Sequence, residues 1–272
     1  MDLGIGTSIE KLIDFLLAHF GPLFDFISRV IGGFMDSTSS ALLSLPPLII
    51  ILGFVIIAWV VADKKVAIFT FLGLLLIFGM GLWVVTIETF VLVLVATIIA
   101  LLLGIPMGIL ISNNRLLDRL VTPVLDFMQT MPPFVYLIPA VMFFGIGNVP
   151  GIMATVIFSM PPAIRLTKLG LQQVPDELEE VGHSFGSTPI QMLVKIKLPL
   201  ALPAIMTGVN QSIMLSLSMV VIASMIGASG LGGEVLNGIQ RMEIGIGFEA
   251  GLAVVILAII LDRITSGITK NI

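Results

Sequence analysis

Seven long apolar segments constrain this chain more strongly than any other feature of its sequence. An α-helix rises about 1.5 Å per residue, so about 20 apolar residues cross a hydrocarbon core of roughly 30 Å. The apolar segments are residues 45–61, 66–84, 90–111, 121–144, 152–168, 200–226 and 246–261. Only 11% of the residues are charged, whereas soluble domains average roughly 25%. The sequence therefore predicts an all-α integral membrane protein with about seven membrane-spanning helices.

Proline residues interrupt the fourth of these segments. Pro132, Pro133 and Pro139 each lack the backbone N–H that continues a helix. We therefore expect the span over residues 121–144 to be broken.

The residue types that carry catalysis and metal binding are scarce. The chain has no cysteine, and its two histidines, His19 and His183, lie outside the predicted spans. We therefore expect no metal site, no bound cofactor and no catalytic residue. An ion-driven secondary transporter would show inverted repeats or acid–base pairs inside the spans. No convincing repeat is evident, and Glu88 and Glu249 lie near span ends.

Basic residues are distributed unevenly between the two sets of loops. One set holds only Lys11, Arg29 and Arg241. The other holds ten of the 13: Lys64, Lys65, Arg115, Arg119, Arg165, Lys168, Lys195, Lys197, Arg263 and Lys270. Because basic loops are retained in the cytoplasm, the N-terminus is predicted to be outside and the C-terminus cytoplasmic.

Residues 1–44 precede the predicted transmembrane domain, residues 45–272, and have an amphipathic pattern. Apolar residues recur there at helical spacing: Ile9, Leu12, Ile13, Leu16, Phe20, Leu23, Phe24, Ile27 and Val30. We expect a helix along the bilayer surface that Gly21-Pro22 kinks or divides. It serves either as a scaffold beside the spans or as an interfacial anchor.

The loop over residues 169–199 is the longest segment on the basic side, and it is rich in acids. Pro175 suits the first turn of a helix, and Asp176 and Glu177 favour its positive end. The helix is predicted to reach Phe185, because Gly186 can take the left-handed conformation that ends it.

A second short helix is predicted to begin directly afterwards. Thr188 and Gln191 have the spacing of a capping box, and Pro189 lies at the first helical position. We expect this helix to end near Lys197. The two helices would present six apolar contact residues: Leu178, Val181, Phe185, Ile190, Leu193 and Val194.

The same loop resembles the "EAA" loop of ABC importer permeases, E-A-A-x3-G-x9-I-x-L-P. The matching residues are Glu180-Val181-Gly182, Gly186 and Ile196-Lys197-Leu198-Pro199, with Val181 and Gly182 in place of two alanines. The resemblance implies a coupling loop that docks on a separate ATPase through Glu180, Gly182, Gly186, Ile196, Leu198 and Pro199. The chain has no G-x-x-x-x-G-K-[ST] phosphate-binding motif of its own, so we do not expect it to be an enzyme.

The resemblance extends to the glycine betaine/proline betaine branch of these permeases. It rests on segments 126–132, 134–137, 149–151, 161–162, 165–167, 173–175 and 210–212. It implies a type I (MetI-like) permease fold in a bacterial cytoplasmic membrane, surrounded by lipid. The implied partners are two ATPase subunits that use ATP and Mg, an extracellular, periplasmic or lipid-anchored substrate-binding protein, and a second copy of this chain; nucleic acid is not among them. The implied substrate is glycine betaine, proline betaine, carnitine or choline, and the alternative is an amino acid such as proline or methionine.

Polar residues within two spans are candidates for the translocation path, because polar groups at membrane depth are costly unless they face a cavity or a partner. The candidates are Gln129, Thr130, Phe134 and Tyr136 in the fourth span and Asn210, Gln211, Ser212 and Ser216 in the sixth. Helix–helix packing is the alternative role for each of them.

Asp126, near the end of its span, is expected to pair with a basic residue. Apart from phenylalanines, the chain has only Tyr136, Trp59 and Trp83 to surround a quaternary ammonium.

The segment over residues 227–247 contains seven glycines, which permit sharp bends and close packing. It is predicted to form either a gate or docking surface on the outer face or a passive re-entrant turn.

Overall fold

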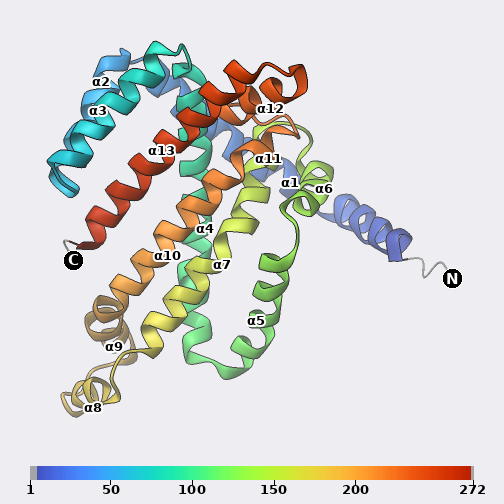
Figure 1. Ribbon diagram of the computed structural model, residues 1–272. Helices are drawn as coiled ribbons and strands as arrows, with labels where there is room; N and C mark the ends of the chain where they lie inside the picture. Colours follow the sequence, from blue (N-terminus) through green and yellow to red (C-terminus); the bar gives the residue numbers. More distant parts are fainter. Residues whose placement is uncertain (1–4, 271–272) are drawn as a thin grey trace.

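Three long helices side by side form the centre of the molecule. They are α4 (Trp83–Asn113), α7 (Asn148–Gln172) and α10 (Leu198–Ser218), and they run along one another in Figure 1. The computed structural model describes residues 5–270, and all its regular elements in that range are helical. Residues 1–4 of the predicted N-terminal segment and residues 271–272 of the predicted transmembrane domain lie outside the described residues.

Small residues allow these three helices to approach closely. A Cβ atom on Gly108 would lie 2.6 Å from the Thr167 Cβ and 2.7 Å from the Ile164 carbonyl oxygen, so α4 and α7 are almost in backbone contact. On the other side of α7, a Cβ on Gly170 would lie 3.0 Å from the Ala201 carbonyl oxygen. Close approach through small residues is the usual way in which helices associate in a membrane.

A helical hairpin and the C-terminal helix flank this centre. The hairpin consists of α2 (Pro47–Val61) and α3 (Lys64–Gly79), and it packs against α13 (Ile244–Lys270). A Cβ on Gly73 would lie 2.6 Å from the Ile256 side chain. The hairpin helices of 15 and 16 residues are shorter than the roughly 20 residues that cross a bilayer.

The first helix, α1 (Ile5–Leu43), is continuous through Gly21-Pro22 and is not divided there. Its second half packs on the bundle: the ring of Phe24 stacks on Phe143 at 4.7 Å, and Met35 is buried. These contacts are those of a helix that lies beside the spans. Its expected position along the bilayer surface stays a prediction.

The predicted fourth span is two helices, α5 (Arg115–Thr130) and α6 (Pro133–Phe144), which meet at an angle of 103°. The bend lies at Met131-Pro132, because proline disfavours helical backbone at the residue before it. Pro139, which was also expected to break the span, lies within α6. Within the described residues, five helices are long and apolar enough to span a membrane, or six if this bent pair counts as one.

The glycine-rich segment forms a turn and a short helix, α12 (Leu231–Arg241), at the opposite end of the molecule from the turn between α4 and α5 (Figure 1). Gly227 and Gly230 take positive φ angles of 86° and 117°. Hydrogen bonds hold this turn on both sides: the Ser229 N–H donates to Asn148 Oδ1 at 2.7 Å, and the Leu231 N–H donates to Thr89 Oγ1 at 2.8 Å. The segment is thus a tightly held turn between the ends of α4 and α7.

Candidate coupling loop and translocation path

The first helix of the coupling loop is α8 (Asp176–Ser184), and the turn that ends it follows the prediction from the sequence. Gly186 has a φ angle of 73°. The Gly186 N–H donates to the His183 carbonyl at 2.9 Å, and the Ser187 N–H donates to the Gly182 carbonyl at 3.0 Å. These two bonds are a Schellman motif, which requires the left-handed glycine. Gly186 therefore fixes the direction in which the chain leaves α8.

The second helix of the loop begins as predicted but does not end at Lys197. Thr188 and Gln191 form both hydrogen bonds of the capping box at the start of α9 (Pro189–Met192). A π-helical segment, η1 (Leu193–Lys197), then joins α9 to α10 without a break. Pro199 lacks the N–H that an α-helix would use at that position, and the turn before it widens to i→i−5 bonding. The end predicted at Lys197 is therefore wrong.

Two contacts fix α8 against this continuous helix. Lys197 Nζ lies 2.6 Å from Glu179 Oε1, and both side chains are less than one-third exposed. Gly182 is buried, and a Cβ there would lie 2.6 Å from Met192 Cε and 2.8 Å from Ile196 Cδ1. The glycine that replaces alanine in the motif therefore gives space to a methionine. The Glu179–Lys197 pair was not predicted, because only the folded loop brings the two residues together.

The outer surface of the loop is apolar with acidic residues beside it. Phe185 is 86% exposed and Ile190 is 75% exposed, and Leu178, Val181 and Val194 are also exposed. Glu180 is exposed on the same helix. Leu193 is the exception among the six predicted contact residues, because it packs against the cluster of Leu171, Ala201 and Ile205. A large exposed apolar surface with a charged rim is typical of a protein-docking site.

The six motif residues differ in what they contact. Glu180, Gly186 and Pro199 are exposed, Gly182 is buried, and Ile196 and Leu198 are partly buried. Leu198 packs against the apolar cluster that α7 and α10 form at this end. The motif therefore combines an exposed acid with residues that position the loop on the bundle.

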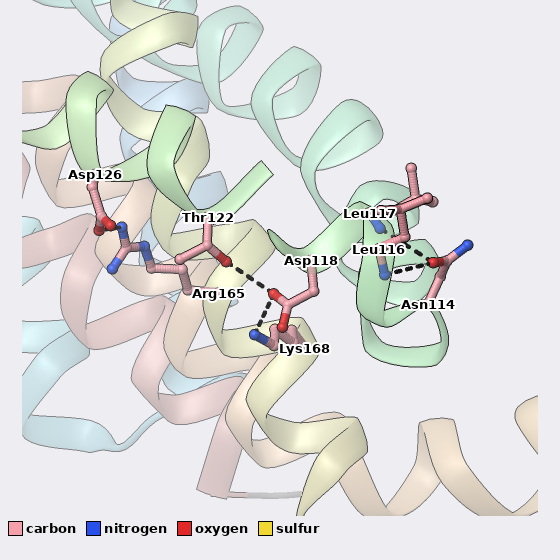
Figure 2. Close-up of polar contacts among 8 residues, drawn as sticks. All are labelled: Asn114, Leu116, Leu117, Asp118, Thr122, Asp126, Arg165 and Lys168. Atoms are coloured by element: carbon pink, nitrogen blue, oxygen red, sulfur yellow. Dashed lines mark hydrogen bonds and ion pairs between the residues drawn. The ribbon is translucent and has the colours of Figure 1, made fainter. Parts of the chain in front are cut away.

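Two ion pairs connect α5 to α7 near the same end of the bundle (Figure 2). Lys168 Nζ lies 2.5 Å from Asp118 Oδ1, which also accepts a hydrogen bond from Thr122 at 2.9 Å. One helical turn away on α7, Arg165 Nη2 lies 2.5 Å from Asp126 Oδ1. The predicted pairing of Asp126 with a basic residue is confirmed.

The path candidates of the fourth predicted span lie in two different environments. Gln129 and Thr130, at the end of α5, and Phe134, at the start of α6, are exposed. Tyr136 is buried, and its hydroxyl donates to the Met128 carbonyl across the bend. The exposed three are available to a solute or a partner chain, whereas Tyr136 holds the bend together.

The candidates on α10 are also divided. Gln211 is exposed, whereas Ser212 and Ser216 are fully buried against neighbouring helices. Thr97 Oγ1 of α4 donates to Ser216 Oγ at 3.2 Å. Asn210 Nδ2 donates to Asp262 Oδ1 of α13 at 2.8 Å. This role of Asp262 was not predicted from the sequence. Its neighbour Arg263 gives no indication of a partner 52 residues away.

The aromatic side chains other than phenylalanine lie on three different helices. Trp59 is on α2, Trp83 is on α4 and Tyr136 is on α6, and only Trp59 is exposed. They do not combine into a cage for a quaternary ammonium within the part of the chain that the structure describes. In that same part, no group of three or more metal-binding side chains comes together.

These features define a helical membrane protein with an exposed apolar loop at one end. The chain belongs to the family of binding-protein-dependent transport system inner membrane components, which matches residues 100–272. Members of this family work with an ATPase and a substrate-binding partner, and they are transport permeases in bacterial membranes rather than enzymes.

Two relatives match this chain along almost its whole length. The glycine betaine transport system permease protein OpuAB of Bacillus subtilis is 48% identical over 260 residues, 96% of this chain and 92% of the relative. The glycine betaine/carnitine transport permease protein GbuB of Listeria monocytogenes is 50% identical over 271 residues, 98% of this chain and 96% of the relative.

The fold is also similar to that of solved transporters. A chain of the inward-facing MetNI methionine ABC transporter matches with a TM-score of 0.61 and 22% identity, over 67% of this chain and 92% of that chain. At this identity the likeness concerns the fold alone. The predicted MetI-like permease fold is confirmed.

Proposed function

We propose that this chain is the membrane-spanning permease subunit of an ABC importer for glycine betaine or a related quaternary ammonium osmoprotectant, such as proline betaine, carnitine or choline. The observation that carries the proposal is the similarity to betaine permeases of 48% and 50% identity over 96% and 98% of the chain. Substrate released by a separate binding protein would pass inward by alternating access.

The coupling loop is the part of the chain that would receive the ATPase. Its exposed Phe185 and Ile190 offer apolar anchors, and the exposed Glu180 offers a charge at their side. Burial of an aromatic anchor in a partner's groove supplies much of the binding energy in protein interfaces. ATP and Mg would bind to the ATPase, and this chain would bind no cofactor.

The translocation path would lie between two copies of this chain, each with its own ATPase. Exposed apolar residues follow one face of α5: Leu116, Leu120, Val124 and Phe127. Gln129 and Thr130 lie at the end of the same helix and are exposed. An apolar contact face that ends in polar groups suits a helix between a second copy and a weakly polar passage.

The coupling loop would face the cytoplasm, with the N-terminus outside and the C-terminus inside. The turn between α4 and α5 lies at the same end of the molecule as α8 and α9, and α12 lies at the opposite end (Figure 1). Arg115, Arg119, Lys195 and Lys197 belong to the first end. Retention of such basic ends in the cytoplasm supports this orientation in a bacterial cytoplasmic membrane.

The test is ATP-dependent uptake in liposomes that contain the chain, the ATPase and the binding protein encoded beside it. We expect uptake of labelled glycine betaine by the wild type and its loss in Glu180→Lys, with membrane insertion unchanged. Lys11→Glu, a charge reversal on α1 far from the coupling loop in sequence, is the control and should retain uptake.

Different failures would reject different parts of the proposal. Uptake of methionine or proline without uptake of any betaine would overturn the substrate class but keep the importer. Full uptake by Glu180→Lys would overturn the coupling role of that residue.

A further inference from the structure

Two cavities lie on either side of the turn between α2 and α3. The first, of about 450 Å³, is a groove between the two helices with an apolar wall that includes Trp59 of α2 and Phe71 of α3. Lys64, the first residue of α3, lines it at the end nearest the turn. The second, of about 360 Å³, lies between the turn and α13 and is lined by Lys65 and Arg263. The apolar groove is thus lined by one cation, Lys64, and two further cations line the cavity on the other side of the turn.

The cations at this turn lack full compensation by acids. Neither Lys64 nor Lys65 forms an ion pair with any side chain that the structure describes. Arg263 is 62% exposed, and its ion pair with Asp262 is long, at 3.8 Å.

The two neighbouring acids already have other partners. Asp63 accepts a hydrogen bond from the Val66 N–H at 2.9 Å, which caps α3. Asp262 accepts one from Asn210 at 2.8 Å. Both carboxylates keep their negative charge, so three cations stand against two acids and the turn has a net positive charge that a ligand with a negative group would meet.

The two helices of the hairpin are short for a membrane span. Helices of 15 and 16 residues are about 22 to 24 Å long, which is less than the roughly 30 Å of a hydrocarbon core. A short hairpin is accommodated by local thinning of the bilayer and by lysines that extend their ammonium groups to the interface. Trp59, which is 59% exposed, suits the same boundary.

We propose that this turn is a binding site for an anionic phospholipid. One acyl chain occupies the groove beside Trp59, and the phosphate lies at Lys64, with Lys65 and Arg263 adding positive potential from the other side of the turn. A water-soluble anion would leave the apolar groove unfilled, and a zwitterionic lipid would leave the cations without a net negative partner. Basic pockets between membrane helices bind anionic headgroups in this way.

Tryptophan fluorescence offers a direct test, because the chain has only two tryptophans and the other, Trp83, is buried. The full-length Trp83→Phe variant is reconstituted in bilayers that contain the same fraction of brominated phosphatidylglycerol or brominated phosphatidylcholine. We expect Trp59 to be quenched more strongly by the anionic lipid, with a relative affinity of roughly fivefold for each cation that contributes. Lys64→Gln should lower this preference, whereas Arg119→Gln, an exposed cation on α5, should leave it unchanged.

Equal quenching by the two lipids would overturn the proposal. So would an undiminished preference in the triple variant Lys64→Gln, Lys65→Gln, Arg263→Gln. If Trp83→Phe does not fold, native mass spectrometry on the wild type and the triple variant from mixed-lipid nanodiscs decides the same question. Anionic lipid retained by the wild type and lost from the triple variant supports the site, and equal retention overturns it.

Discussion

Two adjacent glutamates of the coupling loop should respond differently to the same substitution. Glu179 forms the ion pair with Lys197 that holds α8 to the start of α10, whereas the side chain of Glu180 is exposed. The pair is 2.6 Å long, and its side chains are 29% and 18% exposed. Its loss in Glu179→Gln should cost about 1 kcal/mol, the upper part of the range for surface pairs. Because 1.4 kcal/mol corresponds to a tenfold change in an equilibrium constant, the population of detached α8 should rise roughly fivefold.

Amide hydrogen exchange of α8 measures this detachment, because exchange there follows local opening. We expect exchange across α8 to be roughly five times faster in Glu179→Gln and unchanged in Glu180→Gln. ATPase binding should be weakened by both variants, since the first loosens the loop and the second removes a surface charge. The reversed pair Glu179→Lys, Lys197→Glu should restore slow exchange. Equal exchange rates in the two single variants would refute the assignment of separate roles.

Three further sets of substitutions test the packing, the ion pairs and the proposed docking surface. Gly108→Ala should lower the thermal unfolding midpoint, because overpacking costs about 1–3 kcal/mol. Gly53→Ala should raise the midpoint, because this residue of α2 faces open space. A higher midpoint for both variants would contradict the packing argument. Asp118→Lys and Lys168→Asp should each lower the thermal unfolding midpoint, because each places two like charges together. The double reversal should recover most of this loss, and additive losses would contradict a direct pair. Phe185→Ala should leave the midpoint unchanged but weaken ATPase binding by roughly 30-fold or more, since a buried phenylalanine contributes about 2–3 kcal/mol; an unchanged dissociation constant would show that Phe185 stays outside the interface.

Local features of the coupling loop were predictable because they depend on neighbours in the sequence. The left-handed Gly186 and the capping box of Thr188 and Gln191 are set by bonds that span at most five residues. The end of the second helix was not predictable in the same way. Pro199 usually marks a helix start or break, but here the helix passes through it by widening to a π-helical turn.

Contacts between distant segments account for most of what the sequence did not reveal. Asn210 and Asp262 are 52 residues apart in the sequence, and their hydrogen bond joins α10 to α13. No pattern in either segment identifies the other. The division of the path candidates follows from packing as well. Ser212 and Gln211 are adjacent and both polar, yet one is fully buried and the other exposed, because helix rotation decides which side faces a neighbour.

In the proposed function, the continuity of α9, η1 and α10 would determine how a movement of the coupling loop reaches the membrane. Residues 189–218 form a continuous helical run through α9, η1 and α10, so a displacement at Pro189 would shift the axis of α10 directly. The first helix of the loop, α8, joins this run through the Glu179–Lys197 ion pair and the contact of Gly182 with Met192. A flexible linker between loop and span would absorb a push, whereas a helix transmits it along its length. The helical pitch changes at the π-helical turn, which also holds Lys197, the residue that pairs with Glu179 of α8.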